Sequence, residues 1–190
     1  MPTFFLYLLL LLPFFNLIAL PLTHRLGANP VEKLLLESGQ GALVTLVFLL
    51  LLPVLTQIFT QFQWLKIWMR RRRTIGLTLF FYASLHLLIY VADHLGVIEK
   101  LKTDLLKPFV TTGFVSWLIF MLLAGTSNKW SRKKLKSKWK VLHKFVWISI
   151  PLLMVHLTLK EEGELYKTFF WFTPIGFAWG YKYIGKRTHR

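Results

Sequence analysis

Residues 74–96 read TIGLTLFFYASLHLLIYVADHLG, a long apolar stretch with one histidine, His86, near its middle and a second, His94, close to its end. Residues 139–157, WKVLHKFVWISIPLLMVHL, are similarly apolar and carry His143 and His156 near their two ends. A helix needs roughly 20 predominantly apolar residues to cross a membrane, and both stretches approach that length. Because ionisable side chains are costly in a membrane, these histidines indicate a ligand site, a proton path or another buried site.

The rest of the chain has the same membrane-protein character. Of its 190 residues, 55% are hydrophobic and 17% are charged, whereas soluble domains contain about 25% charged residues. We predict an all-α bundle of six transmembrane helices that forms one domain over residues 1–190. The expected spans are approximately 3–22, 40–60, 74–95, 108–126, 141–159 and 168–184. The first span lacks a preceding basic segment and a small-residue cleavage site, which favours a retained helix over a signal peptide.

Charged residues are divided unequally between the two ends of these spans. All 8 acidic residues lie on the side of the connections that follow spans one, three and five, together with 7 of the 24 basic residues. The remaining 17 basic residues lie after spans two and four, at the start of span five and in the C-terminal tail. Since an excess of Lys and Arg marks the cytoplasmic side, we predict that both termini are cytoplasmic.

The composition also argues against several classes of protein. The chain has no cysteine, which excludes disulfides, cysteine-bound iron–sulfur clusters and the covalent attachment of c-type haem. The basic residues separate apolar segments and form no patch on a soluble domain, so nucleic acid is not an expected partner. No acidic residue lies deep in a span, which disfavours a proton-coupled transporter. Without a dinucleotide fingerprint, any electron must come from another molecule.

The depths of two histidines match. At a rise of 1.5 Å per residue, His86 lies about 20 Å from the basic edge of its span and His156 about 24 Å from the basic edge of span five. These two spans run in the same direction, so a single b-type haem between the two imidazoles is our main hypothesis. The alternative is an interhelical hydrogen bond from each histidine to a nearby hydroxyl, from Ser84, Ser149 or Thr158.

His143 presents a different case, because it lies only about 5 Å from the basic edge and has no histidine partner at that depth. On an ideal helix it also points about 140° away from His156. The two could share a face only if the helix were rewound or kinked, for which Pro151 offers a cause. His143 is therefore a candidate ligand of a second, inner haem, or an interfacial histidine.

Two further residues lie at the edges of the span that carries His86. Arg72 lies fourteen residues before His86, and its guanidinium suits a haem propionate or a phosphate better than iron, because it stays protonated. His94, in the sequence DHLG at the other edge, is expected to be a solvated loop residue.

Short motifs follow one another in a consistent order from about Leu26 to Arg187. They are LGANP (26–30), Ser38-Gly39, Pro53, RRTIGL (72–77), ASLH (83–86) with Tyr90, Lys107-Pro108-Phe109, Gly113, Trp117, Thr126-Ser127, and Trp139-x-x-Leu142-His143 with His156. In this order they resemble the haem-binding membrane subunits of bacterial methionine sulfoxide reductase systems, within the ferric-reductase-like transmembrane group. Thr56 departs from that pattern, since relatives can have arginine after the span-two proline.

The resemblance implies a bacterial inner-membrane protein of six helices with haem b and FMN as cofactors. It implies that His86, His143 and His156 bind haem iron, and that Arg72 and Arg73 bind a propionate or the flavin phosphate. Electrons would pass from a cytosolic flavin reductase to a periplasmic molybdopterin methionine sulfoxide reductase that repairs oxidised proteins, so the chain itself would be a non-catalytic electron-transfer subunit. The alternatives are a haem-based quinol or ferric reductase subunit, and a non-redox scaffold whose basic loops bind membrane lipid.

Overall fold

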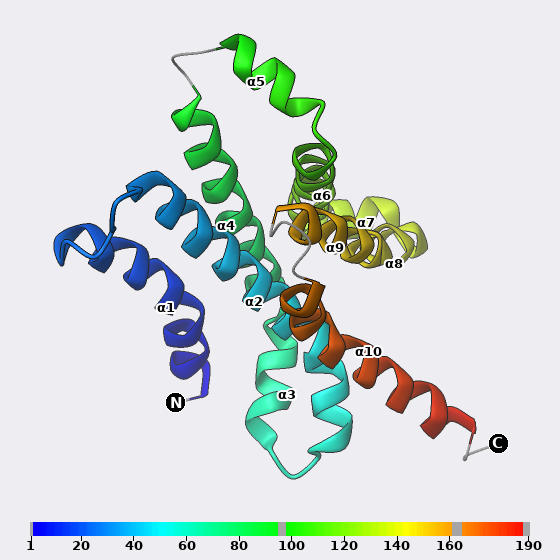
Figure 1. Cartoon of the computed structure of the whole chain (residues 1–190). Helices are drawn as coiled ribbons and strands as arrows, with labels where there is room; N and C mark the ends of the chain where they lie inside the picture. The colour runs from blue at the N-terminus through cyan, green and yellow to red at the C-terminus, as the bar shows by residue number, and fades with distance from the viewer. Residues whose placement is uncertain (1, 95–97, 161–164, 188–190) are drawn as a thin grey trace. The chain divides into compact units, whose positions relative to one another are not determined.

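The computed structural model describes residues 2–94, 98–160 and 165–187, and every regular element in these ranges is a helix (Figure 1). The predicted all-α class is therefore confirmed for the described residues. Two compact units are present, one formed by Met1–Leu79 with Phe169–Arg190 and the other by Phe80–Thr168. Helix α4 contributes residues to both units.

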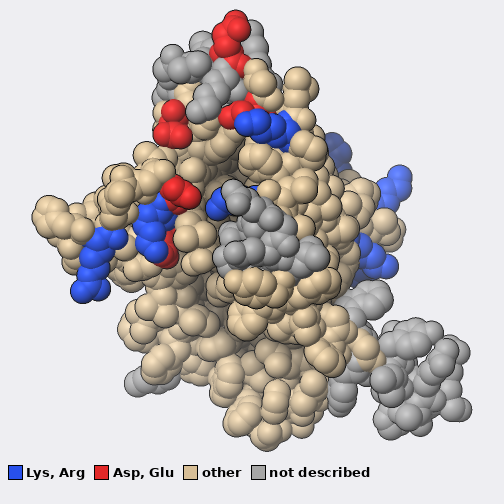
Figure 2. Space-filling view, in the orientation of Figure 1, with Lys and Arg blue, Asp and Glu red and all other residues tan. Residues whose placement is uncertain are grey.

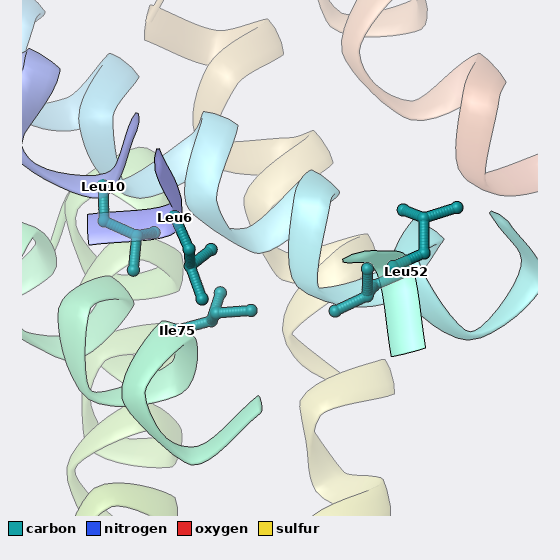
Figure 3. Close-up of a cluster of buried hydrophobic side chains, with 5 residues drawn as sticks. Leu6, Leu10, Leu52 and Ile75 are labelled. Atoms are coloured by element: carbon teal, nitrogen blue, oxygen red, sulfur yellow. The ribbon is translucent and has the colours of Figure 1, made fainter. Parts of the chain in front are cut away.

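The first unit has an aliphatic core. Its helices are α1 (Pro2–Leu22), α2 (Pro30–Ile58), α3 (Gln63–Arg70), the beginning of α4 (Arg72–Asp93) and most of α10 (Leu165–Arg187). Five buried residues form the core, and four of them are labelled in Figure 3: Leu6, Leu10, Leu52, Leu65 and Ile75. The indole nitrogen of Trp68 donates to the Pro2 carbonyl oxygen at 2.7 Å and ties α3 to the start of α1.

Helix α2 begins ten residues earlier than the span predicted at 40–60. The side chain of Asn29 caps it by accepting from the backbone N–H of Glu32, and Pro30 occupies the first turn. Proline suits this position because its fixed φ matches a helix and its missing N–H would have no partner there. The Glu32 carboxylate is also favourable beside the positive end of the helix dipole. The helix therefore includes a polar first turn that hydropathy alone assigned to the connection.

The second unit contains the three histidines of interest. It comprises the remainder of α4, α5 (Ile98–Leu105), α6 (Pro108–Gly125), α7 (Lys129–Leu135), α8 (Ser137–His143), the 3-10 helix η1 (Lys144–Trp147) and α9 (Ser149–Lys160). Helix α6 packs along α9, and the indole of Trp117 in α6 donates to the Ser84 hydroxyl of α4 at 3.0 Å.

Five of the six predicted spans coincide with helical segments long and apolar enough to cross a membrane. Among the described residues these segments are Pro2–Leu22, Pro30–Ile58, Arg72–Asp93, Pro108–Gly125 and Ser137–Lys160. The sixth expected span falls in α10, where the apolar part is the shorter Thr168–Ala178. Broad areas of the face drawn in Figure 2 carry no charged side chain, as expected for a surface in lipid. The sixth crossing and the cytoplasmic termini stay predictions.

Candidate histidine site

The rings of His86 and His156 lie close to each other within the second unit. His86 lies on α4 and His156 on α9, and their ring centres are 6.3 Å apart with an angle of 87° between the planes. Both side chains are half-buried. Two histidines separated by seventy positions in the sequence therefore meet, as their matching depths predicted.

This spacing fits two ligands on opposite sides of one metal. An imidazole nitrogen binds a metal at about 2 Å, and the ring centre lies roughly 1 Å further away, so two opposed ligands have ring centres about 6 Å apart. The measured 6.3 Å agrees with that value. A pair of imidazoles is also one of the ligand sets that a protein can give to haem iron, because the porphyrin supplies the other four nitrogens.

A backbone carbonyl fixes the protonation pattern of the His156 ring. Its Nδ1 lies 2.6 Å from the carbonyl oxygen of Phe109, near the start of α6. Because a carbonyl oxygen only accepts, Nδ1 carries the proton, and Nε2 is the nitrogen with a lone pair for a metal. The hydroxyls of Ser149 and Thr158 donate instead to the Val146 carbonyl and to Thr168. His156 thus makes its interhelical hydrogen bond to the main chain.

His143 lies at the other end of the broken helix and has local partners. Its Nδ1 is 3.1 Å from the carbonyl oxygen of Trp139, and its Nε2 is 3.3 Å from the Ser127 hydroxyl. The ring stacks on the Trp139 indole, with centres 3.9 Å apart and an angle of 28°. That indole donates to the Thr126 carbonyl at 2.9 Å, and the Arg132 guanidinium lies 5.7 Å from its ring centre. The arrangement joins α8 to the end of α6.

The helix is rewound between His143 and His156, which is the condition for the two side chains to lie on one helix face. Residues Lys144–Trp147 form a 3-10 helix, in which each residue turns about 120°, compared with about 100° in an α-helix. Four such residues reduce the angle between the two histidines from about 140° to about 60°. Pro151 accounts for the position of the break, because it has no N–H to donate to the carbonyl of Trp147.

Arg72 and Arg73 belong to the first unit. They occupy the first turn of α4, and both side chains are exposed. Basic residues at the start of a helix oppose the helix dipole, so local helix stability does not explain them. Their predicted role as anion ligands stays a prediction.

The prediction that His94 is a solvated loop residue is wrong. Its side chain is only 7% exposed, with Nδ1 2.8 Å from the Tyr90 carbonyl oxygen and Nε2 3.2 Å from Asp104 Oδ2. Lys107 Nζ lies 2.6 Å from Asp104 Oδ1. This lysine holds the pKa of the Asp104 carboxyl below its usual 3.8, and His94 adds a smaller effect in the same direction. The helix formed by Ile98–Leu105 returns the acid to the end of α4.

Two residues that bind these histidines were not predicted from the sequence, for different reasons. Phe109 acts through its carbonyl oxygen, and a main-chain group is present at every position, so the residue type gives no signal. Asp104 lies ten residues after His94 in a connection that looked purely polar. The only indication of the His94–Asp104 pair in the sequence is that both residues lie on the same side of the predicted bundle.

Comparisons with known proteins identify a transmembrane family and several similar proteins. Residues 38–154 match the family described as ferric reductase like transmembrane component. Three similar proteins are each named protein-methionine-sulfoxide reductase heme-binding subunit MsrQ. That of Herminiimonas arsenicoxydans is 35% identical over 162 residues, covering 84% of this chain and 72% of the relative. The values are 35% over 156 residues (81% and 74%) for Bordetella parapertussis and 34% over 161 residues (83% and 72%) for Ralstonia nicotianae. No solved structure matches the chain.

Proposed function

Because the chain belongs to the ferric reductase like transmembrane component family, we propose that it is a membrane subunit that binds haem b and carries electrons. The observation that supports this most directly is the 6.3 Å separation of the His86 and His156 rings. The similar proteins named as heme-binding subunits of methionine sulfoxide reductase provide independent support.

Each residue of the site has a defined task in this proposal. His86 and His156 would hold the haem iron through one ring nitrogen each, and the Phe109 carbonyl holds the His156 ring so that Nε2 is available. A haem bound there supplies a carrier that accepts and releases one electron at a time. The apolar surroundings on α4, α6 and α9 limit access of water, which influences the redox potential.

Electrons enter, in this proposal, at the end of the second unit that carries His143. Helices α7 and α8 present an exposed basic surface beside it: Lys129, Arg132, Lys133, Lys134, Lys138 and Lys140. Such a surface suits a cytosolic flavin reductase or the phosphate of FMN. His143 serves as an inner haem ligand or as a contact of the flavin, and Arg72 and Arg73 pair with a propionate or the flavin phosphate.

The names of the relatives support an acceptor within a methionine sulfoxide reductase system. We propose that this acceptor is a periplasmic molybdopterin subunit, which performs the chemistry on oxidised proteins. The present chain is then the non-catalytic electron-transfer subunit in the bacterial inner membrane.

A reduced-minus-oxidised optical spectrum of the purified full-length protein tests the proposal. We expect the sharp bands of a low-spin haem with two histidine ligands. Co-expression with the molybdopterin subunit should then make haem oxidation depend on methionine sulfoxide. A colourless protein would favour the membrane scaffold, and a haem that quinol reduces or ferric ion oxidises, with no response to the sulfoxide, would favour the other reductases.

A further inference from the structure

Gly113 on α6 lies against the ring of His156. A Cβ atom built on Gly113 would be 2.8 Å from Nδ1 and 2.9 Å from Cε1 of that ring. Carbon atoms do not approach ring atoms this closely, and a ring held by a hydrogen bond has no flexible end that could move aside. The imidazole of His156 therefore occupies the space that any other side chain at position 113 would need.

The position of Gly113 explains why the ring can reach its hydrogen-bond acceptor. In an α-helix a carbonyl points toward the residue four positions later, so the Phe109 carbonyl points toward Gly113. The imidazole must pass beside the Gly113 backbone to place Nδ1 at 2.6 Å from that oxygen. A carbonyl oxygen has two lone pairs, so it can accept from the ring as well as from its own helix.

The need for glycine at position 113 does not extend to the other described glycine of α6. Gly125, at the end of α6, would meet no atom within 4 Å if it carried a Cβ. Glycine weakens a helix interior relative to alanine, so Gly113 needs a reason that helix formation does not provide. The approach of His156 is that reason.

We propose that Gly113 is a positioning residue for His156, the proposed haem ligand, a role that rests on the function proposed above. Its missing side chain admits the ring to the Phe109 carbonyl, and this hydrogen bond keeps the proton on Nδ1 and directs Nε2 to the iron. A hydrogen bond to the far nitrogen of a metal-bound histidine makes the ligand more basic. Gly113 thus influences the redox potential of the haem without touching it.

The first test compares Gly113→Ala with Gly125→Ala in the full-length purified protein. We expect Gly113→Ala to lose most of the low-spin haem absorption, or to retain it with a changed ferric EPR signal and a shifted midpoint potential. Gly125→Ala should match the wild type in all three measurements. A folded Gly113→Ala protein with the wild-type EPR signal and potential would overturn the proposal.

A double-mutant cycle covers the case in which Gly113→Ala does not accumulate. In the His156→Ala background the clashing ring is gone, so adding Gly113→Ala should no longer reduce accumulation or thermal stability. An equal loss in both backgrounds would show that the ring is not what position 113 accommodates, and would overturn the proposal. A wild-type protein without low-spin haem would overturn the proposed function itself. The double-mutant cycle measures accumulation and thermal stability, so its outcome is independent of that result.

Discussion

His156 and His143 lie toward opposite ends of one interrupted helix and differ in how their rings are held. The His156 ring lies close to the ring of His86 on another helix and donates to a carbonyl of a third, α6. The His143 ring stacks on Trp139 and bonds to its carbonyl, four residues earlier in the same helix. One environment is made by tertiary packing and the other largely by local sequence. The nearby ring of His86 is therefore the structural feature that separates the proposed ligand His156 from His143, which lies in an equally apolar stretch of sequence.

The strongest test of this contrast removes one ring of the His86–His156 pair. His86→Ala or His156→Ala should each abolish the low-spin haem absorption, because one remaining imidazole leaves an axial position of the iron without a protein ligand. Optical spectra of the purified variants provide the measurement, with His24→Ala, in the connection after α1, as the control. If both variants kept the full bis-histidine spectrum, the pair would not be the ligand set.

A second test addresses the other end of the helix. His143→Ala should keep the low-spin spectrum that depends on His86 and His156, because its partners, Trp139 and Ser127, are separate from that pair. Reduction of the haem by a flavin donor should become slower in stopped-flow measurements. A loss of the same low-spin absorption as in the His156 variant would remove the distinction between the two ends.

His94 extends the comparison, since it is buried against an acid rather than opposite a second histidine. The pKa of Asp104 is lowered in the folded protein, so its carboxylate stabilises the fold above the ordinary aspartate pKa. That contribution is lost as the pH falls below about 4 and through the lowered pKa. Asp104→Asn should therefore flatten the acid side of the thermal-stability profile in detergent. Glu99→Gln, at an exposed acid of the same helix, is the control and should leave the profile unchanged.

The smallest expected effect concerns the stack at His143. Trp139→Phe keeps an aromatic ring for the histidine but removes the indole donor to the Thr126 carbonyl. The loss of one such bond costs about 1 kcal/mol of stability. Thermal unfolding should detect it, while Trp130→Phe, at a tryptophan that is 68% exposed, should have a smaller effect. Equal effects would mean that the hydrogen bond does not hold α8 against α6.

Parts of the fold were predictable from the sequence because they depend on local properties. Apolar length alone located five helices that could cross a membrane, and the end of α6 was correct to within one residue. The predicted start of α2 was wrong by ten residues. Asn29 caps the helix and Pro30 occupies its first turn, and this polar turn is not detected by an average of hydropathy. The sequence indicated only that His143 and His156 could share a helix face if the helix were rewound or kinked between them. The structure places that change at Lys144–Trp147.

The sequence by itself determined the membrane class, the helical architecture and the similar depths of His86 and His156, because composition and rise per residue are properties of a single chain segment. Only the tertiary structure decided that these two rings lie 6.3 Å apart, that His94 is buried against Asp104, and that the Phe109 carbonyl accepts from His156. The physical reason is that each of these contacts joins segments that belong to different elements of the fold. Their partners depend on how the helices pack and, for Phe109 and Gly113, on a main-chain group and a missing side chain.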